Sequence, residues 1–335
     1  MKTTTLIYYS LIMVLLTACG KMKDYSLPQD TTPLPLGKVL FSEDSHCFFN
    51  EITMTDSYIV FTDIQSDTTI RAYRKDDFKA QPLVVTKQSG TTNAIAPKLI
   101  YKISKDNDSD NFSAIDNYQF EKTFTLHSSH IEAKTTELQH SPALSFDFYK
   151  VGYELYGSPL TRSYPSPFYY YNPKDKYFWV DPSEKASAAL PPNNDAYACA
   201  LCVNEKAKAA VAAYRYANLL TFYNLKGDAM VTVSIGDKTI APVITHDEVD
   251  VLQSDKCFTT IAGSPKYVYC VYNGSNDFNA LSKIFVFKWN GKHVATWEVD
   301  RNCRAIAVDK TDKYLIAISS RSGGGQDILR YDLTK

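Results

Sequence analysis

Short apolar runs alternate with polar turns along most of the chain, and three of these runs begin at a cysteine. Cys47, Cys257 and Cys303 each open a run that is followed by a turn and, 10 or 11 residues later, by a second run that begins with tyrosine. These tyrosines are Tyr58, Tyr267 and Tyr314. A polar hairpin and a third run follow each time. Runs of this length, rich in aromatic and β-branched residues, predict β-strands.

The same order returns between Ala200 and Gly236, and more weakly in residues 98–126 and 144–180. The second runs begin near residues 58, 210, 267 and 314, so the long first interval accommodates three steps of about 51 residues. Repeats of this length, made of strands without helical periodicity, indicate the blades of a β-propeller. We therefore expect an all-β fold, a six-bladed β-propeller over residues 37–335.

The last repeat ends with its third strand at Leu333, so the outer strand of that blade must come from another part of the chain. The spare strand is Lys38–Phe41, which precedes the first repeat. Pairing of this strand with the last blade would join the two ends of the ring and cover both free edges. We expect loss of the strand to open the ring.

The N-terminus carries an apolar run from Leu6 to Leu16, which is too short to span a bilayer and has the length of a signal-peptide core. Residues 16–19, Leu-Thr-Ala-Cys, resemble the lipobox of bacterial lipoproteins. The resemblance implies cleavage before Cys19 and lipid attachment to its sulfur, and Gly20 in place of an aspartate favours the outer membrane. The alternative is an ordinary secretory signal that happens to precede a cysteine.

Residues 21–36 are polar and contain three prolines, as is typical of a tether. We therefore divide the chain into a signal peptide (1–18), a lipidated tether (19–36) and the propeller (37–335). No later stretch reaches the 18 apolar residues of a transmembrane helix.

Composition agrees with a folded β protein. Hydrophobic residues make up 44% of the chain and charged residues only 22%, so a sizeable core can form. The 24 tyrosines and 17 phenylalanines suit strand surfaces. The 36 basic residues nearly cancel the 37 acidic ones, which argues against nucleic acid as a partner.

A lipobox, a short tether and six degenerate blades together resemble the TolB-like six-bladed propeller lipoproteins of Gram-negative bacteria. Residues 283–320 carry the resemblance best. It implies an envelope location and a role in binding proteins or small ligands, and it brings no invariant catalytic motif. Residues 98–126 and 144–180 match the repeat poorly, so blade boundaries there stay open.

The cysteines predict packing more than chemistry. Cys199 and Cys202 form a CxxC sequence, but on an extended strand residues three apart point to opposite faces, and no second ligand pair is present for zinc. The cysteines that open the repeats occupy equivalent positions and suit buried sites. Because the envelope is oxidising, disulfides among the six cysteines after Cys19 stay possible, with connectivity open.

Residues 106–111 alternate carboxylates as a calcium loop does, but Asn111 replaces the required glycine and Asn117 the bidentate glutamate, so a hairpin turn is favoured. The acidic cluster His246–Asp250 is equally well explained as a loop between blades. Gly323–Gly325 lacks the residues of a phosphate loop and is expected to form a turn. We predict no metal site, no cofactor and no catalytic residue.

Residues 163–197 are rich in aromatics and prolines, and Tyr170 and Trp179 are the candidates for stacking on a sugar ring. The alternative, which the strand-like pattern favours, is that alternate aromatics pack between blades. Side-chain exposure decides between the two interpretations.

The function expected is that of a lipid-anchored, non-catalytic binding or scaffold protein, whose partner is another envelope protein, a small ligand or a glycan. The inner strands of a propeller start around a central funnel, so Asn50, Glu51 and Arg304 are the candidate ligand-binding residues. Two alternatives stay open. One is a metal-dependent hydrolase or lyase with carboxylates converging in the funnel. The other is carbohydrate binding through residues 163–197.

Overall fold

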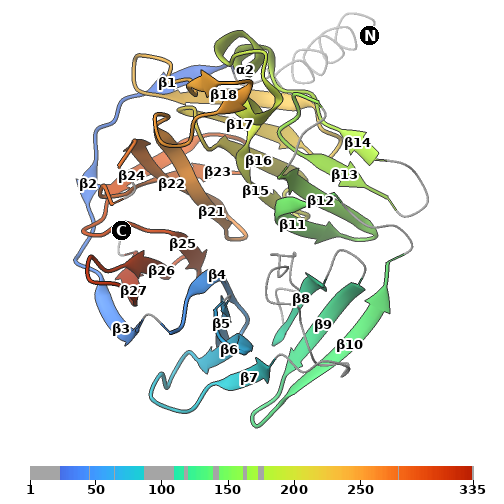
Figure 1. Cartoon of the computed structure of the whole chain (residues 1–335), viewed down its shortest axis with the longest axis vertical. Helices are drawn as coiled ribbons and strands as arrows, with labels where there is room; N and C mark the ends of the chain where they lie inside the picture. Colours follow the sequence, from blue (N-terminus) through green and yellow to red (C-terminus); the bar gives the residue numbers. More distant parts are fainter. Residues whose placement is uncertain are drawn as a thin grey trace, which may run out of the picture.

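Strands separated by turns make up most of the described chain, and six of the seven sheets that they form are arranged around a central axis (Figure 1). The computed structural model describes residues 23–44, 46–63, 65–86, 109–116, 120–138, 143–160, 164–172, 177–277 and 279–333. Each of these six sheets is one blade, with strands that follow one another from the axis towards the rim, and the seventh is the short hairpin of residues 244–249. The predicted six-bladed β-propeller is confirmed.

Neighbouring strands are antiparallel within the first three blades. The strands of blade 1 are β4 (Phe49–Met54), β5 (Tyr58–Asp63), β6 (Thr68–Arg74) and β7 (Leu83–Thr86). Those of blade 2 are β8 (Asn111–Asp116), β9 (Phe120–Leu126) and β10 (Ile131–Glu137). Those of blade 3 are β11 (Ser145–Val151), β12 (Glu154–Pro159), β13 (Tyr169–Tyr171) and β14 (Tyr177–Trp179).

The last three blades follow the repeats closely. The strands of blade 4 are β15 (Cys199–Asn204), β16 (Ala209–Tyr214), β17 (Leu219–Asn224) and β18 (Ala229–Ile235). Those of blade 5 are β21 (Lys256–Gly263), β22 (Tyr267–Ser275), β23 (Lys283–Lys288) and β24 (His293–Glu298). Those of blade 6 are β25 (Ala305–Val308), β26 (Tyr314–Ser320) and β27 (Gln326–Asp332). The three repeat tyrosines begin β5, β22 and β26, as predicted.

β16 shows why the central strands of a blade are apolar along their whole length. All six of its residues are buried. Ala210 and Ala212 belong to the core shared with blade 3, whereas Val211 and Ala213 belong to the core shared with blade 5. A strand covered on both faces is stabilised by apolar side chains at every position, and small ones let neighbouring blades approach closely.

Blade 2 is placed by Asp110, which lies directly before β8. The Asp110 carboxylate accepts hydrogen bonds from the Thr55 hydroxyl (2.8 Å) and the Ser57 N–H (2.6 Å), both in the turn between β4 and β5. β8 therefore starts where the second strand of blade 1 starts, and it corresponds to β5. The first strand expected for this blade, at residues 98–105, lies outside the described residues.

The ring closes through the N-terminal strand, as predicted. β3 (Lys38–Glu43) pairs antiparallel with β27, with Phe41 opposite Ile328, and completes blade 6. The Phe41 ring then stacks on Tyr73 of blade 1, with ring centroids 4.6 Å apart. The Gln326 amide of blade 6 adds two hydrogen bonds to the backbone of Phe49 in blade 1, at 2.7 and 2.8 Å. Side chains and backbone thus join the first blade to the last.

The prediction that residues 19–36 form a tether outside the fold is wrong for part of the segment. β1 (Tyr25–Leu27) pairs parallel with β18, and β2 (Thr32–Pro33) pairs parallel with β24. The outer strands of blades 4 and 5 expose backbone N–H and C=O groups, and a polar, proline-containing segment can satisfy them without any apolar pattern. We call residues 23–43 the strap, because they follow the rim across blades 4, 5 and 6 (Figure 1).

None of the helices in the described part of the chain has the length and apolar character that crossing a membrane requires.

Candidate functional site

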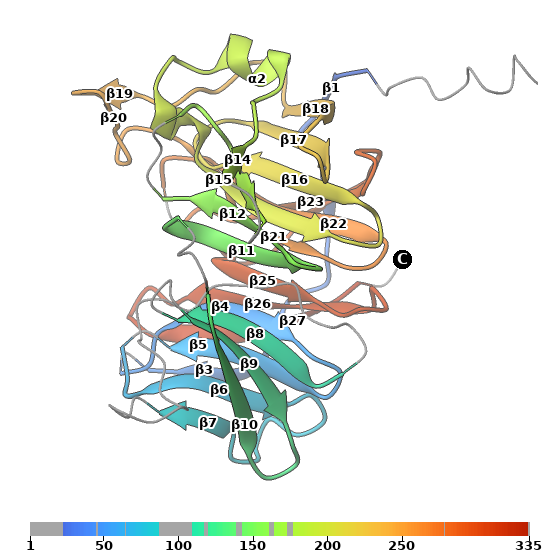
Figure 2. The ribbon, with the colours of Figure 1, turned by 90° about the vertical axis from the view of Figure 1, so that its right-hand side faces the viewer.

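The first strands of blades 1, 3, 4, 5 and 6 all begin on one side of the disc, which we call the long-loop face. Residues 180–198 there carry α2 (Glu184–Ala189) and the 3-10 helix η1 (Asn194–Tyr197), and residues 236–255 carry the hairpin of β19 (Ile244–Thr245) and β20 (Glu248–Val249). Figure 2 shows the disc from its edge, with this hairpin projecting from it. Loops held by a rigid scaffold are common positions for binding residues.

Arg304 lies on this face directly before β25, as the sequence predicts. Its guanidinium carbon is 4.7 Å from the centre of the Phe48 ring, which precedes β4 of blade 1. Its Nη1 donates a hydrogen bond to the Ser320 hydroxyl at 3.1 Å. Burial lowers the pKa of Arg304, yet a guanidinium keeps its charge at neutral pH. The inner edge of blade 6 therefore presents an exposed cation that lies over the ring of Phe48.

Arg215 repeats this arrangement at blade 4, where it follows β16. Its guanidinium carbon is 4.3 Å from the centre of the Phe146 ring on β11, and its Nη1 donates to the Thr259 carbonyl at 3.4 Å. The Nε–H of Arg215 is buried and has no acceptor. The Thr259 hydroxyl donates in turn to the carbonyl of Cys303, the residue before Arg304. The two arginines thus lie on either side of the inner strand of blade 5, which carries Thr259, and we call them the mouth arginines.

The mouth arginines differ from the other five arginines that the structure describes. Each of those five has a carboxylate within 4.0 Å. The pairs are Arg71–Asp63, Arg74–Asp76, Arg301–Asp300, Arg321–Asp327 and Arg330–Asp332. The described residues supply no such partner to Arg215 or Arg304. A guanidinium held flat on a ring without a counter-ion offers its donors to an anionic group.

Asn50 and Glu51, the other residues predicted at the funnel, lie on β4 close to Phe48. Asn50 is exposed, whereas only 9% of Glu51 is exposed. Burial raises the pKa of the Tyr149 phenol on β11, and the negative charge of Glu51 adds to that rise. Glu51 therefore lies near the inner strand of blade 3. Neither residue contributes a cation to the funnel.

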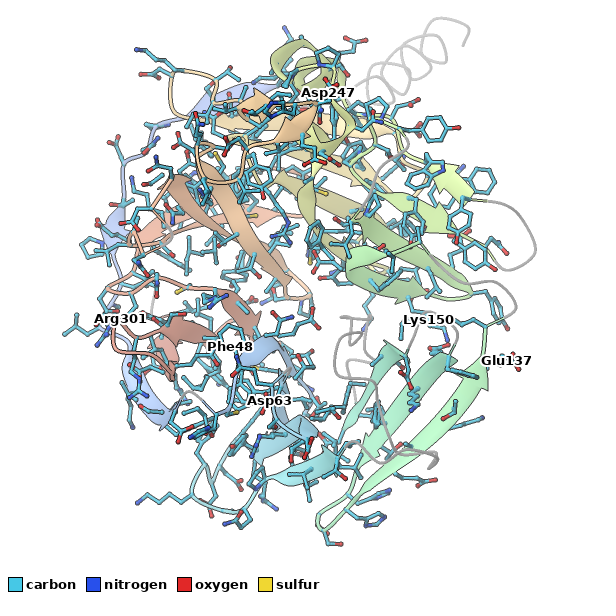
Figure 3. All side chains as sticks on the ribbon, viewed as in Figure 1. Phe48, Asp63, Glu137, Lys150, Asp247 and Arg301 are labelled. Carbon is cyan, nitrogen blue, oxygen red and sulfur yellow. The ribbon has the colours of Figure 1, made fainter. Side chains whose placement is uncertain are left out.

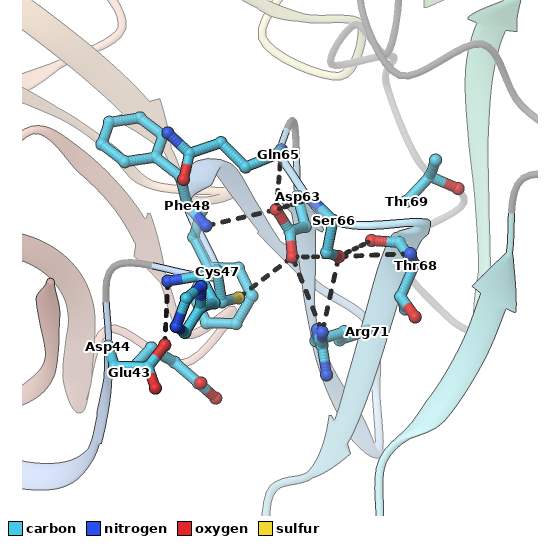
Figure 4. A network of polar contacts seen from close by, with 12 residues as sticks. Glu43, Asp44, Cys47, Phe48, Asp63, Gln65, Ser66, Thr68, Thr69 and Arg71 are labelled. Atoms are coloured by element: carbon cyan, nitrogen blue, oxygen red, sulfur yellow. Dashed lines mark hydrogen bonds and ion pairs between the residues drawn. The ribbon is translucent and has the colours of Figure 1, made fainter.

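Asp63 fixes the backbone beneath Arg304. Its fully buried carboxylate accepts hydrogen bonds from the Cys47 thiol (3.0 Å), from the N–H groups of Phe48, Gln65 and Ser66, and from the Ser66 hydroxyl at 2.6 Å (Figure 4). Burial alone would raise the pKa of Asp63, but these hydrogen bonds outweigh it and lower the pKa. The ring of Phe48 is thereby held in a defined position. Figure 3, which draws the side chains as sticks, shows Asp63 and Phe48 on the inner side of blade 1.

The CxxC sequence is structural, as predicted. Cys199 and Cys202 lie on β15 and point into the cores on opposite sides of blade 4. All six described cysteines are buried, and no disulfide joins them. The repeat cysteines Cys47, Cys257 and Cys303 belong to inter-blade cores as well.

Metal-ligating side chains do not gather among the described residues, since no three of His, Cys, Asp or Glu lie together there. Of the calcium-like sequence, residues 106–108 lie outside the described part, and Asp110 serves the contact with blade 1 described above. His246 and Asp247 form the turn between β19 and β20 with φ angles of 52° and 64°. This cluster is a loop between blades 4 and 5, as one of the two interpretations predicted.

The aromatic segment of blade 3 divides between core and rim. Tyr169 and Tyr171 of β13 are buried, as the packing interpretation predicts. Tyr170 and Trp179 are partly exposed, and Tyr170 stacks on Phe178, of which 44% is exposed, with ring centroids 4.9 Å apart. Alternate residues thus point to opposite faces of the blade. Carbohydrate binding by the exposed set stays a prediction.

Known structures share this fold at low sequence identity. No protein-family model matches the chain, and neither does the sequence of any curated protein. A member of the duf4221 family from Bacteroides vulgatus matches with a TM-score of 0.57 and 11% identity over 90% of this chain and 96% of that one. A protein from Bacteroides fragilis that is described as exported matches with a TM-score of 0.54 and 10% identity, covering 94% and 100%.

The WD40 repeats of RRP9 match equally well, with a TM-score of 0.54 and 10% identity over 90% of this chain and 99% of theirs. Likeness at such identities concerns the fold alone. The propeller that the TolB-like resemblance implies is therefore present, while membership of that family stays a prediction.

Arg215 is the residue of this site that the sequence does not reveal. It follows the second strand of the fourth repeat, within Tyr-Arg-Tyr, and resembles any turn residue. Only the packing of β16 against blade 3 brings it onto Phe146. Its one sequence signal is negative: no acidic residue stands within five positions of it.

Proposed function

We propose that this chain is a non-catalytic binding protein of the cell envelope, and that Arg215 and Arg304 bind an anionic group of its ligand. The observation that carries the proposal is the pair of guanidinium groups without a carboxylate partner, each resting on a phenylalanine of a neighbouring blade. The partial burial of Arg215 strengthens its attraction to an anion relative to bulk water, whereas Arg304 is exposed and open to a ligand. Carboxylate, phosphate or sulfate suits the fork of donors that an arginine offers.

The envelope location rests on the N-terminal sequence. The apolar run of residues 6–16 and Cys19 favour export and lipid attachment, and the exported protein of B. fragilis with the same fold agrees with this location. Metabolic labelling with palmitate tests the anchor. Label should appear on the wild-type chain and be absent from Cys19→Ala, and a labelled Cys19→Ala protein would contradict it.

The binding site is tested with small anions on the full-length protein in detergent. Galacturonate and inorganic phosphate serve as probes in calorimetric titrations, with potassium chloride at equal ionic strength as the reference. At least one probe should bind the wild type, and Arg215→Gln with Arg304→Gln should weaken that binding at least tenfold, because charge-assisted hydrogen bonds are lost. Retained affinity in the double variant would refute the proposal.

Arg330→Gln is the matched control. Arg330 also rests on an aromatic ring, with its guanidinium carbon 4.1 Å from the centre of Tyr314, but it pairs with Asp332 at 2.8 Å. Its replacement should leave probe affinity within twofold of the wild type. A loss as large as that of the double variant would show that general surface charge, and not the mouth arginines, causes binding.

A further inference from the structure

An open groove of about 690 Å³ lies beside Arg304, between blades 5 and 6 on the long-loop face. Three connections form it: the one after β22, the one before β25 and the hairpin between β26 and β27. Polar and charged residues line it together with Leu281 and two glycines. The lining residues are Asn279, Leu281, Asp300, Arg301, Asn302, Ser320, Arg321, Ser322, Gly323, Gly324 and Asp327.

The two carboxylates of the groove are already used by the protein. Asp300 accepts hydrogen bonds from the Gly37 N–H (3.1 Å) and the Tyr331 hydroxyl (2.8 Å), and Asp327 accepts one from the Ser42 hydroxyl (2.7 Å). Gly37 and Ser42 belong to the strap. Each acidic group therefore holds the strap against blade 6 through its Oδ1 atom.

The basic and amide groups of the groove keep donors available. Arg301 approaches Asp300 only through Nε, at 4.0 Å, and 49% of its side chain is exposed (Figure 3). Arg321 donates through Nη2 to the Glu43 carbonyl at 2.8 Å, which leaves Nη1 for other acceptors. Among the described residues, no acceptor faces the amide N–H groups of Asn302. The groove thus offers more donors than acceptors to a ligand.

The groove continues into the site of the mouth arginines. Ser320, which lines the groove, accepts the hydrogen bond from Arg304 described above. One stretch of the long-loop face therefore carries the mouth arginines and, beside Arg304, Arg301 and Arg321. These last two approach their carboxylate partners through Nε, at 4.0 and 3.7 Å, so terminal N–H donors remain that can contact further negative charges along one extended ligand.

We infer that the groove is a second anion subsite and that the ligand of the long-loop face is an acidic oligosaccharide, with uronate carboxylates on the arginines and sugar hydroxyls on Asn279, Asn302 and Ser320. This inference rests on the proposed function, since it extends the same site. A peptide is the weaker candidate because β27 is paired on both sides, so the described part of the groove has no free strand edge, and Leu281 is the one large apolar side chain among its described lining residues.

The test compares a tetramer of galacturonate with monomeric galacturonate on the full-length protein. The groove variant Arg301→Gln with Asn279→Ala removes donors that do not contact the strap. It should weaken tetramer binding at least tenfold and monomer binding less than twofold, whereas the mouth variant Arg215→Gln with Arg304→Gln should weaken both. Arg330→Gln again serves as the control, and melting temperatures confirm that each variant is folded.

The outcomes separate the two proposals. Unchanged tetramer affinity in the groove variant, or no tetramer binding at all, overturns the oligosaccharide subsite, and monomer binding that still depends on Arg304 then leaves the mouth site standing. A tetraglutamate peptide that binds as tightly as the tetramer, with the same dependence on Arg301, overturns the choice of a glycan. A neutral galactose tetramer should not bind measurably.

Discussion

Asp63 keeps its negative charge inside the protein because five hydrogen bonds are donated to its carboxylate. The Arg71 guanidinium adds an ion pair at 3.6 Å. A buried carboxylate without such partners would take up a proton instead. At the scale of single residues, this network determines the position of Phe48, and through it the position of the Arg304 guanidinium.

We predict that Asp63→Asn lowers the free energy of unfolding by about 3 kcal/mol, because an amide oxygen accepts less strongly and the amide N–H groups would face other donors. Urea denaturation followed by tryptophan fluorescence measures the change. Asp76→Asn is the control, since Asp76 pairs with Arg74 in full exposure and should leave the midpoint unchanged. Equal midpoints for wild type and Asp63→Asn would contradict the role given to this carboxylate.

The stability from Asp63 also has a defined pH dependence. Because the folded state lowers the pKa of Asp63, the contribution is complete above the unfolded-state pKa of about 4 and is lost as the pH falls through the lower folded-state value. The difference between wild type and Asp63→Asn should therefore be constant from pH 5 to 7 and shrink in more acidic buffer. A stability difference that grows on acidification would contradict a lowered pKa of Asp63 in the folded state.

Sequence reasoning reached Arg304 but not Arg215, and the reason is physical. Arg304 follows a repeat cysteine and can be placed by counting from it, whereas Arg215 stands in a turn whose position relative to blade 3 depends on how two blades pack. Contacts across a blade interface join residues far apart in the chain. No local pattern encodes them.

At the scale of elements, β3 carries the closure of the ring. Phe41 stacks on Tyr73 and meets Phe49 and Phe61 edge-on, so its ring belongs to blade 1 while its backbone belongs to blade 6. We predict that Phe41→Ala costs about 3 kcal/mol in the free energy of unfolding, from lost burial and a cavity between the blades. Thermal unfolding measures the loss.

Val39→Ala is the control on the same strand. Val39 pairs with Leu329 through the backbone, but 44% of its surface is exposed, so its replacement should cost well below about 1 kcal/mol. Limited proteolysis gives a second measurement, since an opened ring should be cleaved near the strap in Phe41→Ala and not in Val39→Ala. Equal cleavage of both variants would contradict the prediction that the Phe41 side chain keeps the ring closed.

The strap shows where element prediction fails. β3 contains the apolar run Val39–Phe41, which predicts a strand, and its predicted pairing with the last blade is confirmed. β1 and β2 are three and two residues long and lie among prolines and polar residues, so they look like a tether. Their pairing depends on the free rims of blades 4 and 5, which exist only after those blades have folded. Burial of apolar side chains contributes little to it, and hydropathy therefore gives no signal.

At the scale of the whole molecule, the cores between blades contain thiols where an exported protein could carry disulfides. We predict that the six described cysteines react slowly with Ellman's reagent in the native protein and at the rate of free cysteine in 8 M urea. Burial raises the pKa of Cys303 to about 12, so its thiolate is scarce at neutral pH, and the shift of Cys257 has the same direction and cause.

A reducing agent should then leave the melting temperature unchanged, because no disulfide joins these cysteines. A drop of several degrees on reduction, or fewer than six reactive thiols after denaturation, would show that the chain forms disulfides when exported. Serine substitution of Cys270 offers a packing control, since it should destabilise the protein with or without reductant.

The number of blades was predictable because the repeats at both ends are strong and their spacing fixes how many units fit between them. Blade 2 was the hardest to place, and its described strands are positioned by Asp110 contacting another blade. The circular arrangement could be predicted because the repeats are visible in the sequence. The groove could not be predicted, because it forms where three loops of different repeats meet.

Pairing of β1 with the rim of blade 4 has a geometric consequence for a chain anchored at Cys19. Only five residues separate Cys19 from Tyr25, and a fully extended chain of that length spans about 20 Å. A free segment up to residue 36 would have let the body drift roughly three times as far. An anchored disc would instead stand on edge with blade 4 nearest the lipid headgroups, leaving both flat sides open to the aqueous space.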